Sequence, residues 1–166
     1  MPCVLFEAAA VGRTGYESRD ELNADTELKE RVEELRFAVG PMMNLEDVGS
    51  LTVPKMTLVA PPRNGGSITT RSFIPHDCHA AIGVFAAVSV ATACIMEGST
   101  ASRVAVVPEG LRKMFSVEHP TGEMSVEMEF EGSADNPVIK RAALLRTARR
   151  LFEGQILVSD SVWKNA

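Results

Sequence analysis

The residues best suited to chemistry form one polar cluster, His76-Asp77-Cys78-His79, directly before a long uncharged stretch from Ala80 to Met96. That stretch predicts a helix, and the first amides of a helix have no internal partner and lie at its positive end. A carboxylate can bind there. His79 would stand beside it with an imidazole that exchanges a proton near neutral pH, so we predict that His79 is catalytic. The alternative is structural, with Asp77 capping the helix.

The same cluster raises two further possibilities, a thiolate–histidine pair and a metal site. No distant motif supplies partners for either, and the three cysteines, Cys3, Cys78 and Cys94, show neither metal-ligand spacing nor a disulfide framework. We therefore predict no metal and expect reduced thiols.

Other candidate anion ligands lie elsewhere in the chain. The tight turn His119-Pro120-Thr121-Gly122 can expose amides and a hydroxyl to an anion, although an ordinary hairpin turn is the alternative. Arg71 precedes the uncharged stretch, and Arg146 belongs to an arginine-rich segment. Guanidinium groups pair well with carboxylates, while solvation is their plainer role.

Two predicted helices would organise these residues. The stretch from Ala80 to Met96 is shorter than a membrane span and apolar on all sides, which favours a central helix wrapped by sheet. A second, amphipathic helix is predicted over residues 18–39, because Ser18 and Glu21 form a capping box. Its apolar face is Leu28, Val32, Leu35 and Val39.

Most of the remaining segments read as strands. The clearest runs from Met124 to Phe130 with a period of two, and Phe115 to His119 precedes it as the other half of a hairpin. Propensity favours a helix from Val138 to Phe152. The other predicted strands are Cys3–Phe6, Lys55–Ala60, Ser67–Ile74 and Gln155–Ser159. Together the elements predict one α+β domain over residues 1–159, followed by a frayed tail over 160–166.

Length, composition and charge limit the function. The chain has 166 residues, 45% of them hydrophobic, and a net charge of −5. These values are ordinary for a single globular domain, and the acidic balance argues against a nucleic-acid binder. Local arginines can still form a positive pocket. The N-terminus does not read as a signal peptide, so we expect a cytoplasmic protein that does not enter a membrane.

Several segments, in order along nearly the whole chain, resemble the C-terminal half of the PrpF-like family. This family contains 2-methylaconitate cis–trans isomerases, 4-oxalomesaconate tautomerases and methylitaconate isomerases. The ordered set carries the resemblance rather than any one motif. The segments are Gly12 to Glu17, Val53-Pro54-Lys55, Arg71-Ser72, Cys78-His79-Ala80-Ala81, His119 to Gly122, and Arg146 to Gly154.

The resemblance implies a diaminopimelate-epimerase-like fold, in which a curved mixed sheet surrounds one central helix in each of two domains. It implies strands in the segment from Val138 to Ser159, against the propensity for a helix. It further implies cofactor-independent isomerisation, by allylic proton transfer, of an unsaturated di- or tricarboxylate such as 2-methylaconitate or aconitate. The substrate would lie between the domains, at the helix starts.

Residue by residue, the resemblance places His79 on the family's histidine before the central helix. The predicted substrate-binding residues are Arg71, Ser72, Thr121, Gly122 and Arg146. Family members often carry a lysine after the histidine and a Thr-Gly pair in the first helical turn, where this chain has Ala80 and Val84-Phe85. The resemblance therefore does not carry over the substrate contacts that the family makes in that turn.

The family also has a preceding domain, which carries the lysine and cysteine assigned to proton transfer. We therefore expect a truncated chain that is nearly inactive alone and works as a homodimer or with a separate N-terminal-domain chain. The alternative is a non-catalytic remnant that binds a polycarboxylate or a partner protein. An epimerase that uses Cys78 is a third, weaker possibility.

Overall fold

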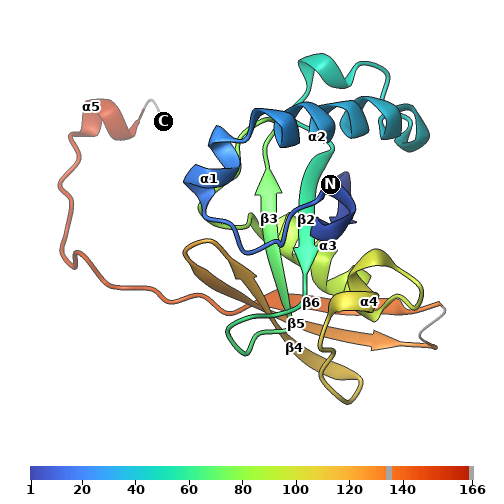
Figure 1. Ribbon diagram of the computed structural model, residues 1–166. Helices are drawn as coiled ribbons and strands as arrows, with labels where there is room; N and C mark the ends of the chain where they lie inside the picture. The colour runs from blue at the N-terminus through green and yellow to red at the C-terminus, as the bar shows by residue number, and fades with distance from the viewer. Residues whose placement is uncertain (134–135, 165–166) are drawn as a thin grey trace.

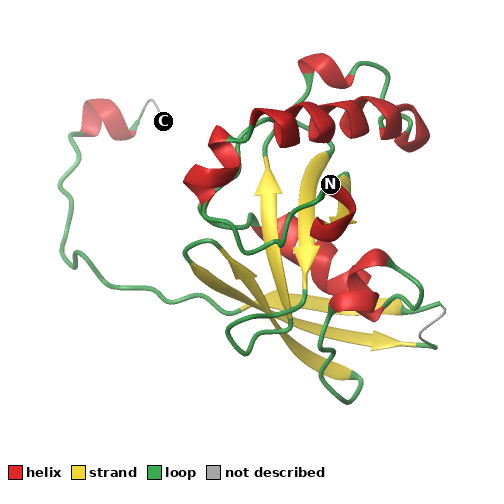
Figure 2. Ribbon diagram, viewed as in Figure 1, coloured by secondary structure: helices red, strands yellow, loops and turns green. Residues whose placement is uncertain are grey.

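One six-stranded sheet forms the framework of the protein, with the strands in the same order in the sheet as along the chain. The computed structural model describes residues 1–133 and 136–164. Figures 1 and 2 show the sheet with helices on both faces. The strands are β1 Cys3–Glu7, β2 Lys55–Ala60, β3 Ile68–Phe73, β4 Arg112–His119, β5 Gly122–Glu131 and β6 Val138–Leu144.

The sheet is mixed and sharply curved. β1 is parallel to β2, β2 is antiparallel to β3, and β4, β5 and β6 form an antiparallel meander. β3 and β4 are parallel partners only at Ile68–Val117 and Thr69–Glu118. Because this joint is so short, the two halves of the sheet turn away from each other (Figure 1).

Helix α3, Val84–Ile95, lies in the concave side and contacts β1, β4, β5 and β6. Ala87, Val90 and Ala91 are fully buried there. This arrangement confirms the predicted α+β half, with a curved sheet around one central helix. The short α4, Thr100–Val104, follows it. None of the helices in the described part of the chain has the length and apolar content needed to cross a membrane.

The central helix begins at Val84, four residues later than the uncharged stretch predicted. Residues 78–80 stay extended beside the end of β3 and the β4–β5 turn, so they are not available to the helix. The side chains of Val84 and Phe85 are 42% and 71% exposed. The first turn is therefore open to solvent, and the prediction of burial on all sides was wrong there.

Helices α1, Arg19–Ala24, and α2, Thr26–Val39, cover the opposite face (Figure 1). The predicted capping box at Ser18 is present. The predicted single helix is divided at Asp25, because its carboxylate caps α2 through Leu28 N (3.0 Å) and binds Arg13 Nε (2.6 Å). Short 3-10 helices span Ala8–Val11, Pro41–Met43 and Val48–Ser50.

The buried stripe of α2 differs from the predicted one. Leu28, Val32 and Arg36 are buried at four-residue spacing, whereas Leu35 is 38% exposed. Leu28 and Val32 pack in the core that lies on this side of the sheet, together with Leu58. The buried face of α2 includes Arg36 instead of Leu35, because the Arg36 guanidinium binds the loop that leads into β2.

The C-terminal segment departs most from the sequence-based predictions. Residues 138–144 form β6 and not a helix, as the resemblance implied, but residues 145–159 form neither helix nor strand. The predicted strand Gln155–Ser159 was therefore wrong. The segment extends away from the sheet to the one-turn helix α5, Asp160–Trp163 (Figure 1). Residues 165–166 of the predicted tail lie outside the described residues.

Candidate functional site

The loop between β3 and α3 is held at its centre by two neighbouring elements. His79 N donates to Ser72 O on β3 at 2.9 Å. On the other side, both the backbone N and the hydroxyl of Thr121 donate to Ala80 O, at 3.2 and 2.8 Å. The structure thus brings together the predicted residues His79, Ser72 and Thr121, through the backbone of residues 79–80.

The side chains of these residues do not all reach the same face of the sheet. Phe73 and Cys78 form a β-bridge and are both buried on the α1–α2 side. Because side chains alternate along extended chain, Ser72 and His79 belong to the other face. Ser72 Oγ lies there 3.0 Å from Thr57 Oγ1, while the His79 side chain is exposed.

Arg71, one residue before Ser72, lies on the α1–α2 side and is only 8% exposed. Its Nε donates to Glu17 O (2.7 Å) and its Nη1 to Thr70 O (2.9 Å). Nη2 has no acceptor within residues 1–133 and 136–164, and the guanidinium forms no ion pair there. Burial lowers the pKa of Arg71, yet a guanidinium remains charged at neutral pH.

The guanidinium of Arg71 faces a polar pocket with a volume of about 340 Å³, whose other walls include Tyr16, Arg63, Glu118 and His119. Burial lowers the pKa of His119, against the raising effect of the Ala80 backbone. This histidine is therefore neutral at pH 7 and can accept or donate a hydrogen bond. The pocket combines cationic groups and a titratable imidazole, which suits a carboxylate ligand.

Most of this pocket was missed from the sequence. His119 was recognised only as part of a turn, and Tyr16, Arg63 and Glu118 were not predicted as site residues. No spacing rule connects residues 63 and 118, which come together only through the short β3–β4 joint. The sole local signal was the Asn64-Gly65-Gly66 turn next to Arg63.

The start of α3 lacks a side-chain cap. Gly83 is the N-cap residue and makes no capping hydrogen bond through a side chain. Asp77, the alternative cap from the sequence, instead forms an ion pair with Lys29 at 2.8 Å. The first-turn amides therefore retain the capacity to bind an anion that the sequence predicted.

The other predicted ligands occupy different positions. Gly122 begins β5 opposite His119, with a φ of 151° that side-chain-bearing residues rarely adopt. Arg146 lies in the exposed extended segment after β6 and does not line the pocket of Arg71. The structure thus places Gly122 beside His119, which lines the pocket, and leaves Arg146 outside the pocket.

The cysteines do not form a reactive centre. Burial raises the pKa of Cys78 to about 11 and that of Cys94 to about 12, so both thiols are protonated at neutral pH. This argues against a thiolate–histidine pair at Cys78 and His79. Across the described residues, no group of three or more His, Cys, Asp or Glu side chains is placed to hold a metal.

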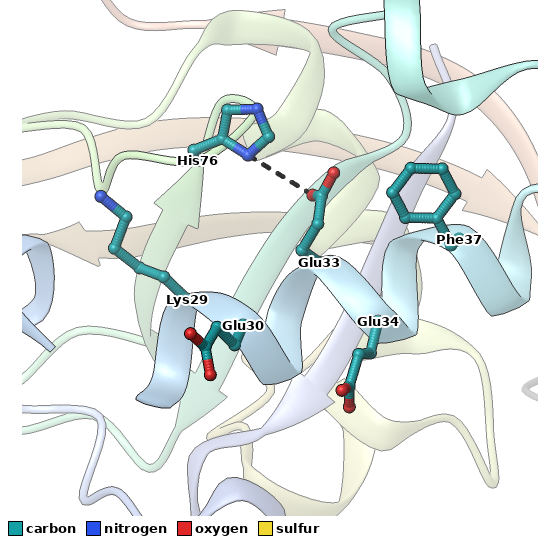
Figure 3. A pocket seen from close by; sticks show the side chains of 6 residues that line it. All are labelled: Lys29, Glu30, Glu33, Glu34, Phe37 and His76. Carbon is teal, nitrogen blue, oxygen red and sulfur yellow. Dashed lines mark ion pairs between the residues drawn. The ribbon is translucent and has the colours of Figure 1, made fainter. Parts of the chain in front are cut away.

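A wider hollow of about 710 Å³ runs along α2 but has the wrong charge for a polycarboxylate (Figure 3). Glu30, Glu33 and Glu34 line it, and its lysine, Lys29, already binds Asp77. His76 Nδ1 lies 3.5 Å from Glu33, as the dashed line in Figure 3 marks. Three carboxylates would repel an anionic substrate.

Comparison with known proteins supports the resemblance seen in the sequence. The family model described as "PrpF protein" matches residues 1–159. This chain belongs to the PrpF family. A (4E)-oxalomesaconate Delta-isomerase from Novosphingobium sp. (strain KA1) is 59% identical over 95% of this chain. A 4-oxalomesaconate tautomerase from Pseudomonas putida (strain KT2440) is 52% identical over 98% of it.

This PrpF-family chain spans less than half the length of both relatives: 43% of the Novosphingobium protein and 44% of the Pseudomonas protein. Among solved structures, a methylitaconate-delta-isomerase matches with a TM-score of 0.72 and 18% identity, over 87% of this chain and 42% of that one. This likeness supports the fold.

Proposed function

We propose that this chain forms the C-terminal part of a cofactor-independent isomerase whose substrate is oxalomesaconate or a closely similar unsaturated polycarboxylate. The 59% and 52% identity to two proteins named for oxalomesaconate favours this substrate over 2-methylaconitate or aconitate. The observation that carries the proposal is the Arg71 guanidinium, which faces a polar pocket without a carboxylate partner in the described chain.

The proposed reaction removes a proton from an allylic carbon and returns one at the far end of the conjugated system. Negative charge then spreads onto the adjoining carboxylate, as in a dienolate. The uncapped amides of α3 would stabilise that charge, because donors placed where charge develops lower the barrier most. Arg71 would bind a carboxylate of the same substrate from its own pocket, which adjoins this loop through His119 and the Thr121–Ala80 hydrogen bond. His79 would transfer the proton, and the Thr121–Gly122 turn would position the substrate.

A second domain would complete the site. Leu151, Leu157 and Trp163 in the C-terminal segment are 89%, 93% and 73% exposed. Exposed apolar side chains gathered in one segment mark a surface that another protein can cover. We propose that a separate N-terminal-domain chain supplies that surface, with a homodimer as the alternative.

The test is proton NMR in deuterium oxide with oxalomesaconate as substrate. The chain would be assayed alone and after co-expression with the part of the Pseudomonas relative that it does not match. We expect little exchange alone, and deuterium incorporation at the allylic position in the co-expressed complex. His79→Ala should abolish that incorporation.

One result would contradict the proposal, and another would change only the role of His79. Binding of oxalomesaconate without exchange, in a complex that forms, would support the non-catalytic alternative. Unchanged exchange in the His79→Ala variant would remove that residue from the mechanism and leave the isomerase itself in place.

A further inference from the structure

Arg63 lies at the rim of the polar pocket, in the loop between β2 and β3. Its guanidinium carbon is 5.1 Å from the centre of the Tyr16 ring, which suits a cation–π contact. The Tyr16 hydroxyl donates to Pro61 O at 3.1 Å and so fixes the ring against the same loop. The side chain is exposed and forms no ion pair in the described part of the chain.

The two carboxylates near these arginines, those of Glu118 and Glu17, already accept hydrogen bonds at both oxygens. Glu118 is 3% exposed and accepts four hydrogen bonds, from Arg63 N (2.9 Å), Asn64 N (2.7 Å), Gly66 N (2.9 Å) and Thr69 Oγ1 (2.6 Å). These contacts lower the pKa of Glu118 despite its burial, so it stays ionised at pH 7.

Glu17, the other acidic residue close to Arg71, is occupied in the same way. Its carboxylate accepts from Thr14 N at 2.7 Å and from Gly15 N at 2.9 Å. Neither carboxylate therefore forms an ion pair with an arginine. Arg63 and Arg71 line the same pocket, and the charge of Arg63 adds to the lowering of the Arg71 pKa that burial causes.

The loop that carries Arg63 depends closely on Glu118. A Cβ atom at Gly66 would lie 2.7 Å from Glu118 Cγ and 2.8 Å from its Oε1, so the backbone can approach this carboxylate only as glycine. Three amides of this loop and one hydroxyl donate to the single side chain of Glu118. Together with the contact between Arg63 and Tyr16, these hydrogen bonds hold residues 63–66 at this position.

We propose that Arg63 and Arg71 bind the two carboxylates of one dianionic ligand in this pocket, and that Glu118 is the residue that positions Arg63 for this purpose. Charge-assisted hydrogen bonds from two guanidiniums recognise a dicarboxylate far better than a monocarboxylate. This inference rests on the proposed function in one point: it takes the natural ligand to be an unsaturated polycarboxylate.

The first test compares two probes by isothermal titration calorimetry: mesaconate, an unsaturated dicarboxylate, and crotonate, a monocarboxylate of similar size. In Arg63→Gln we expect mesaconate affinity to fall about tenfold or more, and crotonate affinity to change much less. Arg103→Gln is the matched control, because Arg103 pairs with Glu7 outside the pocket. Equal losses for both probes, or no loss for either, would overturn the proposal.

The second test uses the sign of the effect of Glu118→Gln. Removing a negative charge beside an anion site should strengthen binding if electrostatics alone mattered. A positioning role predicts the opposite, a several-fold weaker affinity for mesaconate. If that variant fails to fold, Thr69→Val removes one of the four hydrogen bonds and should weaken mesaconate binding in the same direction. Stronger binding in either variant would refute the role of Glu118.

The two proposals fail separately. Isomerase activity that is unaffected by Arg63→Gln would contradict the dianion site and leave the proposed function standing. If mesaconate binding depends on Arg63 but the complex has no isomerase activity, the dianion site stands and the proposed function is contradicted.

Discussion

Arg36 and Arg71 are the two buried arginines among the described residues, and they differ in whether the guanidinium has a carboxylate partner. Arg36 is fully buried, and its guanidinium binds the Glu33 carboxylate through Nε and Nη2 at 2.7 and 2.6 Å. Its Nη1 donates to the carbonyls of Val48 and Leu51. Arg71 has only carbonyl acceptors and leaves Nη2 open to a pocket. The comparison separates an arginine that holds the fold from one that is available to a ligand.

The largest effect is expected at Arg36. Arg36→Met would leave Glu33 without its partner and several carbonyls without a donor, at a cost of about 3 kcal/mol in the free energy of unfolding. Urea denaturation measures this cost. Arg31→Met, on the exposed side of the same helix, is the control and should change stability by less than about 0.5 kcal/mol. Similar losses of stability in both variants would show that Arg36 stabilises the fold no more than an exposed arginine does.

Arg71→Gln should show the reverse pattern. It removes a desolvated cation that has no carboxylate partner in the described chain, but it also removes the hydrogen bonds to Glu17 O and Thr70 O. These effects oppose each other, so the free energy of unfolding should change by less than about 1 kcal/mol. Affinity for mesaconate should fall by about a hundredfold, because the ligand loses a buried charge-assisted contact. Calorimetric titration and urea denaturation of one preparation give both values. A large loss of stability with intact binding would make Arg71 a second structural arginine.

A smaller effect is expected from His119, whose pKa is lowered from 6.5 by burial. The unfolded chain then binds this proton more readily, so the free energy of unfolding should decrease as the pH falls below about 6.5. Bound mesaconate should raise the pKa of His119, because an anion favours the imidazolium. An NMR titration of the ring protons, with and without mesaconate, measures both effects. His119→Gln should remove this part of the pH dependence.

Arg146 should give the smallest effect. In the chain alone it lies in the exposed segment beyond β6, so Arg146→Gln should leave both mesaconate affinity and stability unchanged. The same variant in the co-expressed complex tests the prediction that Arg146 binds substrate once a second domain is present. A loss of affinity in the isolated chain would show that the segment folds back to the pocket.

Local sequence determined much of the fold. The alternating run from Met124 to Phe130 became β5, the capping box at Ser18 started α1, and the uncharged stretch became the central helix. These signals depend on neighbours within a few residues, where periodicity and capping act directly. Propensity failed from Val138 to Leu144, because pairing with β5 outweighs the helix preference of that segment.

The sequence by itself determined the family, the central helix and the histidine before it. Only the tertiary structure decided on which face of the sheet the side chains of the neighbours Arg71 and Ser72 lie, one on each face. Only it brought Glu118 and Arg63 together across 55 residues. The face on which a side chain lies and the pairing of β3 with β4 both depend on contacts between residues far apart in the sequence. The role of Glu118 could be assigned only once its hydrogen-bond donors were known.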